Sequence, residues 1–368
     1  MLLIIFARLN GGLTMNIREL RNMFPALSRT VYGKQLVYFD NAATAQRSQS
    51  VIDKWTQLTI GANANIHRAV HKLAVDATDE YESTRDAVKE YINAAAREEI
   101  VFTSGTTGSI NLVAFSFGET FVNKGDEIIV SESEHHSNIV PWQMLCQRKG
   151  AVLRVLHVDE DGHLNLKELK SLLNPKTRIV AVTQISNVLG ILNPVKEIVS
   201  VCHSVGCPVL IDGAQGMVHE GVDVQDVDCD FYAFSGHKLY AATGTGVLYG
   251  KRKWLDQMVP YQGGGEMIAT VRFSGTTYAP LPEKFEAGTQ NINAIPTLEP
   301  AIEMLKLMKD KELLNAQEAV SQYLLHALTS NPRIRLYGVP RGTETKIPLF
   351  SFSVEGAHHE DLALILDK

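Results

Sequence analysis

Apolar and polar positions along the chain follow two periods that alternate with each other. Short apolar runs bounded by turn residues predict strands, and longer stretches with apolar residues every three or four positions predict amphipathic helices. The run QLVYFD at residues 35–40 predicts a strand, NAATAQ a loop, and the residues from about Ser50 a helix. A helix over residues 75–93, the strand-like EEIVFTS and a helix opening with GTTGSINLVAFSF follow.

The same alternation continues through the middle of the chain. Strands are predicted at DEIIVSE, AVLRVLHVD, TRIVAVTQIS, PVLIDGA and CDFYAFS, and helices over residues 142–149, 166–173 and 195–205. Such regular alternation is typical of the α/β class, in which a mostly parallel central sheet carries helices on both faces. Ligands of these sheets bind beyond the carboxyl ends of the strands. The residues directly after each strand are therefore the first candidates for chemistry.

The pattern changes after Lys251. A glycine-rich segment, YQGGGEMIATV, leads into a proline-punctuated stretch that reaches Pro296. One long helix is predicted over about residues 297–330, and IPLFSFSVEG and HHEDLALILDK predict a last strand and helix. A change of pattern at this point indicates a second structural unit.

A chain of 368 residues is long enough for a large domain and a smaller one. We expect an N-terminal extension and arm at residues 1–35, a large domain at 36–280 and a small α+β domain at 281–368. No stop signal follows the last helix, so we expect the small domain to be incomplete. The apolar opening MLLIIFAR is too short to span a bilayer and has the wrong order for a signal peptide. Because NIRELRNMFPAL predicts the first amphipathic helix, Met15 is the expected natural start.

Composition narrows the classes of partner. Hydrophobic residues make up 45% and charged residues 21% of the chain, as in ordinary globular proteins. The formal net charge is -6 and the basic residues are scattered, which argues against nucleic acid or a membrane surface and favours a small-molecule substrate. The four cysteines form no paired motif, so a disulfide framework is excluded and a cytoplasmic location is expected.

The motif SGTTGS lies between a predicted strand and a predicted helix. Its backbone N–H groups and the helix N-terminus can hold a phosphate, with Thr106 and Thr107 adding hydroxyl groups. An ordinary turn with a helix cap would look the same. The motif lacks the lysine of a nucleotide-binding loop and the glycine spacing of a dinucleotide site, which counts against ATP and NAD.

Two later motifs each follow a predicted strand. In LIDGAQ, Asp212 comes directly after a buried strand, where a carboxylate needs a cationic or hydrogen-bonding partner; a helix cap or the ring nitrogen of pyridoxal phosphate (PLP) would both serve. In FSGHK, Lys238 could condense with the cofactor aldehyde while Ser235 and His237 bind its phosphate. A lone loop lysine is usually only solvated, so this interpretation depends on its neighbours and on its place after Asp212.

Histidines supply further candidates. His135 of SEHHSN follows the strand DEIIVSE and could stack on the cofactor ring and exchange protons. The adjacent His136 invites a metal interpretation, but no cluster with metal-ligand spacing accompanies it, and no metal is expected. His67 and His71 lack the glutamate of a zinc protease helix, so substrate contact or plain surface remain the alternatives.

The ordered set of motifs is specific. DNAATA, NIHRAVHKLA, TSGTTGSIN, SEHHSNIVPWQ, QISNVLG, IDGAQG, DFYAFSGHKLY, GGGEMI and FEAGTQN occur in the chain in this order. Together they resemble group II cysteine desulfurases, of the SUF/CSD type, and the related selenocysteine lyases of the class V aminotransferase family. The resemblance runs from about Leu36 to Lys368 and implies the aspartate aminotransferase-like fold of PLP-dependent transferases, fold type I.

The resemblance also implies roles for single residues. Lys238 would form the Schiff base with PLP and remove the α-proton of the substrate, and Asp212 would pair with the ring nitrogen. Gln215 would hydrogen-bond the phenolic oxygen of the cofactor. His135 would stack on its ring.

The phosphate site is implied in the same way. Thr106, Thr107, Ser235 and His237 would bind the phosphate group, and Thr289 of FEAGTQN would reach it from a partner subunit. The family is therefore expected to form a homodimer. Asn187 would lie near the substrate carboxylate and His67 near the bound amino acid.

By resemblance, the reaction converts L-cysteine, or L-selenocysteine in some relatives, to L-alanine. A thiolate on a C-terminal loop takes the sulfur as a persulfide, which passes through a sulfur-acceptor protein to iron–sulfur cluster assembly. In the family pattern this cysteine would fall about a dozen residues beyond Lys368, and none of the four cysteines present stands in a matching motif. The expectation is a chain that binds PLP yet fails to desulfurate cysteine.

Two positions depart from the family pattern, and two rival functions remain. Ser104 stands where relatives often have arginine, and Gly108 where they often have glutamate, so the charge near the phosphate differs. One rival is another PLP reaction on the same fold, such as a racemase, an epimerase or a β-lyase, which needs no thiol nucleophile. The other is a dimerising relative that binds a sulfur-acceptor partner without turnover.

Overall fold

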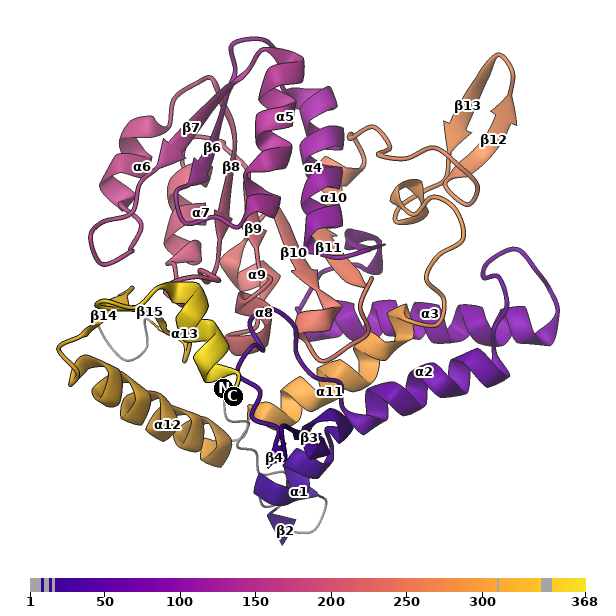
Figure 1. The fold of residues 1–368 in the computed structure, drawn as a ribbon. Coiled ribbons are helices and arrows are strands. Elements are labelled where there is room, and N and C mark those ends of the chain that lie inside the picture. Colours follow the sequence, from indigo (N-terminus) through magenta and orange to yellow (C-terminus); the bar gives the residue numbers. More distant parts are fainter. Residues whose placement is uncertain (1–7, 10–12, 15–16, 310, 339–345) are drawn as a thin grey trace.

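A seven-stranded sheet lies at the centre of the computed structural model, which describes residues 8–9, 13–14, 17–309, 311–338 and 346–368 (Figure 1). The strand order is β5-β11-β10-β9-β8-β6-β7. The strands are β5 (Ile100–Thr103), β6 (Glu127–Ser131), β7 (Val152–Leu156), β8 (Thr177–Thr183), β9 (Val209–Asp212), β10 (Phe231–Ser235) and β11 (Gly246–Gly250). Strand β11 runs antiparallel to both of its neighbours, and the other pairs are parallel. The predicted mostly parallel sheet is confirmed.

Helices cover both faces of the sheet, as alternation along β8 makes clear. Val180 and Val182 belong to one buried cluster, whereas Ile179 and Ala181 belong to the other. Successive side chains of a strand point to opposite faces, so each face buries its own core. The first face carries α3 (Lys72–Tyr91), α6 (Leu166–Leu172), α7 (Val195–His203) and α9 (Val224–Val227), and the second carries α4 (Thr106–Phe121), α5 (Val140–Lys149) and α10 (Arg252–Leu255).

The predicted strand over residues 35–40 is wrong. Only a two-residue strand, β4 (Lys34–Gln35), forms there, and it pairs with β3 (Thr30–Val31). Val37 and Phe39 are 66% and 62% exposed. An apolar run becomes a strand only where a neighbouring strand supplies hydrogen bonds and a face to bury, and this segment instead leads across the mouth of the pocket described below. The helix expected from about Ser50 is confirmed as α2 (Gln49–Gly61).

The single long helix predicted over residues 297–330 is also wrong. The chain forms α11 (Leu298–Met308) and α12 (Lys311–Thr329), which run in different directions (Figure 1). Helix α11 buries its apolar stripe against α2 and α3, within the core of the large sheet. Helix α12 instead contacts β14 (Ile334–Tyr337). The helix therefore ends where its packing partner changes.

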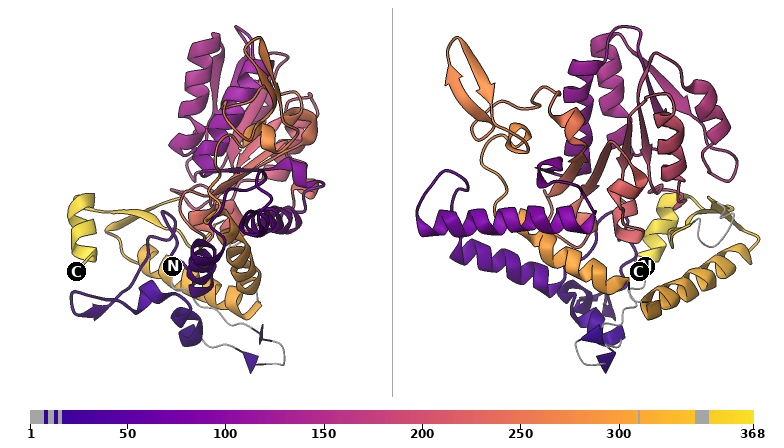
Figure 2. Two further views of the ribbon diagram at one scale, coloured as in Figure 1. Left: turned by 90° about the vertical axis from the view of Figure 1, so that its right-hand side faces the viewer. Right: turned by 180° about the vertical axis from the view of Figure 1, so that it is seen from behind.

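Several strands were not predicted from the sequence. Strand β11 completes the sheet, and β12 (Ile268–Arg272) pairs with β13 (Gly275–Tyr278) in a hairpin that stands away from the sheet (Figure 2). Strand β14 pairs with the predicted last strand, β15 (Ser351–Val354), and α13 (His359–Leu366) follows. The division into domains at residues 35 and 280 stays a prediction.

The N-terminal segment is described only in part. Strands β1 (Arg8–Leu9) and β2 (Leu13–Thr14) pair, and α1 (Ile17–Asn22) begins the predicted first helix. Met15, the expected start, and residues 1–7 of the apolar opening lie outside the described residues. Within the ranges given above, no helix combines the length and the apolar character needed to cross a membrane.

Candidate active site

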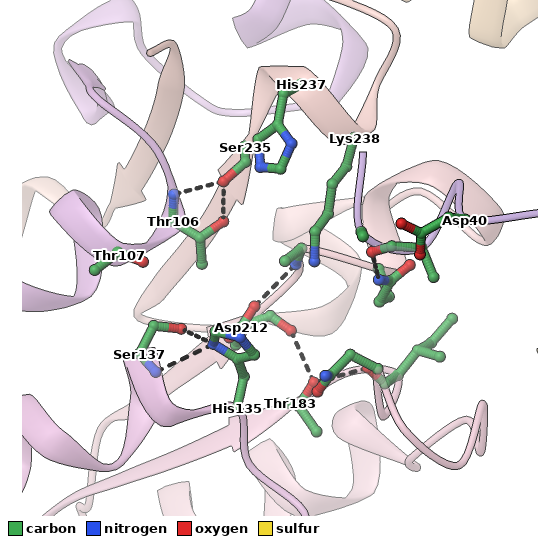
Figure 3. Close-up of a pocket in the computed structure, with 16 residues that line it drawn as sticks. Asp40, Thr106, Thr107, His135, Ser137, Thr183, Asp212, Ser235, His237 and Lys238 are labelled. Atoms are coloured by element: carbon green, nitrogen blue, oxygen red, sulfur yellow. Dashed lines mark hydrogen bonds between the residues drawn. The ribbon is translucent and has the colours of Figure 1, made fainter. Parts of the chain in front are cut away.

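A pocket of about 450 Å³ lies at the carboxyl ends of the central strands, where the sheet rule places ligands (Figure 3). Among the residues predicted to carry chemistry, all but His67 and Thr289 line it. The lining residues are Asp40, Ala42, Ala43, Thr106, Thr107, His135, Ser137, Thr183, Ile185, Asn187, Asp212, Ala214, Gln215, Ser235, His237 and Lys238. They come from strand ends and loops far apart in the sequence.

One end of the pocket is built from hydroxyl groups and a helix start. Thr106 is the first residue of α4, and both its N–H and its hydroxyl lie 2.8 Å from the hydroxyl of Ser235 at the end of β10. Both side chains are buried. The N-terminus of a sixteen-residue helix carries partial positive charge and free N–H groups, so this end of the pocket suits an anion.

A close backbone approach shapes this end. Gly105 precedes α4 with a φ of +146°, which side chains rarely adopt. Strand β11 passes so near that a Cβ on Gly246 would lie 2.3 Å from the Cα of Gly105. Glycine is therefore required at position 246 for the turn that presents Thr106.

Asp212 occupies the opposite end of the pocket. It ends β9, is 3% exposed, and its Oδ1 accepts the N–H of Ala214 at 2.9 Å. Burial raises the pKa of its carboxyl group, while the Ala214 N–H, Lys238 and His135 lower it. No ion pair within 4.0 Å joins Asp212 to a cationic side chain of the described chain, so a buried carboxylate here lacks a direct cation.

Lys238 reaches into the pocket from the turn after β10. Its side chain extends towards the end at which Asp212 and His135 lie (Figure 3). Burial lowers the pKa of its amine, and the negative charge of Asp212 acts in the opposite direction. A lysine whose pKa is lowered is more often neutral and therefore a better nucleophile towards an aldehyde.

His135 lines the pocket with its ring held at Nδ1. Its Nδ1 accepts the backbone N–H of Ser137 at 3.1 Å and lies 2.7 Å from the Ser137 hydroxyl. Partial burial, followed by the charge of Lys238, lowers the pKa of the ring. An accepting Nδ1 places the proton of the neutral imidazole on Nε2.

Three more of the predicted residues complete the lining. The side-chain N–H of Gln215 donates to the carbonyl of Ala42 at 2.7 Å, which ties the turn after β9 to the segment across the pocket mouth. His237 lies 3.2 Å from the hydroxyl of Thr44 through Nδ1, and burial lowers the pKa of its ring. Asn187 lies in the loop after β8 and is partly exposed in the pocket.

His67 and Thr289 do not line this pocket. His67 Nε2 lies 3.0 Å from Glu82, which raises the pKa of the ring. Thr289 lies in another pocket, of about 260 Å³, beside Ser104 and Gly108. Their expected roles, one near the substrate and one across a subunit boundary, stay predictions.

Some lining residues were missed by the reading of the sequence. Thr183 ends β8, so the strand-end rule that selected Asp212 would have selected it too. Ala42 and Ala43 had no comparable signal, because alanines in a loop carry no chemistry of their own. No three metal-ligating side chains converge anywhere in the described ranges.

Comparison with known proteins agrees with this geometry. The model of the aminotransferase class-V family matches residues 37–368, so the chain belongs to that family. Members of the family are PLP-dependent. A cysteine desulfurase from Pectobacterium carotovorum is 45% identical over 353 residues, which cover 96% of this chain and 86% of the relative. One from Escherichia coli O8 is 45% identical over 356 residues, covering 96% and 87%.

Solved structures of cysteine desulfurases are also similar to this chain. The cysteine desulfurase CsdA from Escherichia coli superposes with a TM-score of 0.85 at 38% identity, covering 96% of this chain and 86% of that one. The apo cysteine desulfurase from Thermococcus onnurineus gives a TM-score of 0.87 at 34% identity, covering 95% and 85%. Within the class V aminotransferases, the chain therefore belongs to the cysteine desulfurases.

Proposed function

We propose that this chain binds PLP and acts on L-cysteine, which it converts to L-alanine while the sulfur atom leaves to an acceptor thiol. One observation carries the proposal. A buried aspartate without a direct cation and a lysine with a lowered pKa lie in the same pocket as a helix start that suits an anion.

The donor set fits the cofactor. Thr106, Thr107, Ser235 and His237 would hold its phosphate, and Asp212 would accept the proton of its ring nitrogen, the cation that the carboxylate lacks in this chain. A pocket of about 450 Å³ is within the range of cofactor sites. When bound, the cofactor supplies an electron sink for the carbon that carries the amino group.

Side chains of this protein would carry out the proton transfers and orient the substrate. The Nζ atom of Lys238 would hold the cofactor through its aldehyde and, once free, would accept the proton from the substrate Cα. His135 covers one side of the pocket and offers the proton on Nε2. Asn187 orients the substrate carboxylate, and Gln215 the phenolic oxygen of the cofactor. With the cofactor bound, its ring nitrogen would supply a cation beside Asp212 and would favour the ionised carboxylate.

The sulfur acceptor is not one of the four cysteines. Cys146, Cys202, Cys207 and Cys229 are all buried and unpaired, and none lines the pocket. Burial raises the pKa of each thiol, that of Cys202 to about 12. A thiolate is the attacking species, so these side chains are inert. The acceptor must be a different thiol, on a sulfur-acceptor protein or on a further cysteine.

A homodimer and a cytoplasmic location are part of the proposal. In the dimer, Thr289 of each subunit would contact the phosphate bound by the other. L-Selenocysteine, whose C–Se bond is weaker, is the alternative substrate that the same pocket would accept. A racemase or a β-lyase is disfavoured because the relatives that match are cysteine desulfurases.

Turnover by the 368-residue chain tests the proposal. Loaded with PLP and given L-cysteine and a small dithiol as acceptor, the chain should release alanine and sulfide in equal amounts. Without the dithiol, none of the four cysteines can take the sulfur, so little or no alanine should form. Pyruvate and ammonia in place of alanine would show a β-lyase and contradict the proposal, as would D-cysteine, which would show a racemase.

A further inference from the structure

Glu134 lies directly before His135 and does not line the pocket. It follows β6 and is 8% exposed. Its carboxyl group contacts the Ser131 hydroxyl, accepts the backbone N–H of Thr183 at 2.8 Å and accepts the side-chain N–H of Asn138 at 2.7 Å. One side chain thus ties β6, the end of β8 and the short 3-10 turn η3 (His136–Asn138) together.

This turn is the element that carries His135. His135 is its N-cap residue, and Asn138 is its last residue. The Asn138 side-chain oxygen in turn accepts the indole N–H of Trp142 at 2.9 Å, and Trp142 is fully buried in α5. The His135 turn is therefore anchored from beneath by a chain of buried hydrogen bonds that begins at Glu134.

No cation accompanies Glu134 among the described ion pairs, whereas a second carboxyl group lies nearby. Thr183 pairs in register with Asp212 on the adjacent strand β9. Neutral groups of Ser131, Asn138 and Thr183 face Glu134 from β6, η3 and β8. Burial, and then the charge of Asp212, raise the pKa of Glu134 to about 8, against the opposing effect of its hydrogen bonds.

We propose that Glu134 is a positioning residue, a neutral carboxyl group that holds the His135 turn against β8 so that the negative charge beneath the pocket stays on Asp212. Two carboxylates one strand apart in a buried region repel each other, and one proton removes that cost. The neutral form still satisfies its partners. In the neutral form the hydrogen bond with Ser131 would reverse: the Glu134 O–H would donate to the Ser131 hydroxyl, which lies 3.2 Å from the Ser133 hydroxyl and can donate onward.

Two substitutions at position 134 distinguish the effect of losing the ionisable group of Glu134 from the effect of losing its hydrogen bonds. Glu134→Gln keeps one accepting oxygen for the Asn138 side-chain N–H, and its NH2 group can donate to the Ser131 hydroxyl but leaves the Thr183 N–H without its partner. The His135 turn should therefore keep its geometry through Asn138. Glu134→Ala leaves the Thr183 N–H and the Asn138 side chain without their partner. Glu132→Gln is the matched control, because Glu132 is exposed and accepts only the Val158 N–H, at 3.1 Å, among its described hydrogen bonds.

The first measurement uses ligand-free protein. In Glu134→Gln and Glu132→Gln, nitrogen NMR of the His135 ring should keep the wild-type pattern with the proton on Nε2, and in Glu134→Ala that pattern should be lost. The pH dependence of the free energy of unfolding reports whether Glu134 is charged. Because the folded pKa of Glu134 is raised, wild-type stability should fall relative to Glu134→Gln between about pH 4.5 and about pH 8.

The second measurement rests on the proposed function. With PLP and L-cysteine, Glu134→Gln should keep activity within about threefold at pH 7 and lose less than wild type at pH 9, while Glu134→Ala should lose tenfold or more. Equal damage from both variants, or a wild-type His135 pattern in Glu134→Ala, would overturn the inference. If Glu134→Ala does not fold, the pH dependence of activity in Glu134→Gln, compared with wild type, tests the inference instead. An inactive wild type with the expected NMR result would refute the proposed function alone.

Discussion

Two buried charged clusters in this molecule differ in how completely their partners are supplied. Arg85 and Glu286 have side chains that are 0% and 2% exposed, and two hydrogen bonds of 2.7 and 2.9 Å join them. Glu286 also accepts the N–H of Phe102 at 2.7 Å and the hydroxyl of Tyr81 at 3.2 Å. The guanidinium lies 4.5 Å from the Phe102 ring centroid.

The pocket cluster is built in the opposite way. Asp212 has one backbone donor and no direct cation in the described chain, and Lys238 has a lowered pKa because it is buried without a close counter-charge. A cluster that only holds the fold together saturates its charges, because any unpaired buried charge is costly. A cluster that receives a ligand leaves them for the ligand to complete. The contrast is physical evidence for function that does not depend on family membership.

Breaking the cluster of Arg85 and Glu286 should give the largest loss of stability. Arg85→Met leaves the Glu286 carboxylate buried and uncompensated, so we expect the free energy of unfolding to fall by about 3–5 kcal/mol. Replacing both partners, as Arg85→Met with Glu286→Leu, should recover part of the loss. Denaturant titration measures both. A matched control is Arg148→Met, whose half-exposed ion pair with Glu119 should matter by at most about 1 kcal/mol.

The two clusters are structurally distinct only if Arg85→Met changes stability and leaves the pocket intact. A loss no larger than that of Arg148→Met would contradict the view that the Arg85 cluster holds the fold.

Neutralising the pocket carboxylate should separate activity from stability. Asp212→Asn removes the counter-charge for the cofactor ring, so we expect cysteine turnover to fall by about 10²–10³-fold. The raised pKa of Asp212 means that the folded state binds its proton more tightly than the unfolded chain, so wild-type stability declines as pH rises from about 4. Asp212→Asn should therefore unfold at neutral pH with unchanged or higher free energy. A destabilisation as large as that of Arg85→Met would make Asp212 a structural residue.

A smaller loss of stability is expected from a substitution where the backbone of Gly246 closely approaches that of Gly105. Gly246→Ala places a methyl group against the Cα of Gly105, and overpacking of this kind costs about 1–3 kcal/mol. The displaced turn should also weaken the contact between Thr106 and Ser235. Gly61→Ala, where a Cβ meets nothing within 4 Å, is the control. Equal melting temperatures for the two variants would show that the approach is not tight.

Much of the pocket could be predicted from the sequence because one rule applies to all of it. Apolar strands followed by polar residues place Thr106, His135, Asp212 and Lys238 at the same edge of a parallel sheet. Glu134 was not singled out, although it lies next to His135. Whether such a glutamate is buried depends on β8 and α5, which the local pattern does not reveal.

The elements that were predicted wrongly or missed have a common cause. Residues 35–40 have strand composition but pair only at Gln35. Residues 297–330 have helical period throughout, while the surface that they pack against changes near Lys309. Strand β11 was missed because GVLYG begins and ends with glycine, which is unfavourable in a strand interior. In each case tertiary contacts override the local pattern.

Lys238 is the residue on which the proposed function depends most, because it would bind the cofactor aldehyde. Incubation of the protein with PLP, reduction with borohydride and peptide mass mapping measures this directly. We predict a pyridoxyl phosphate adduct on the peptide that contains Lys238, absent from Lys238→Ala and retained in Lys167→Ala, a variant at an exposed lysine on α6. An adduct on another lysine, or none at any PLP concentration, would contradict the account.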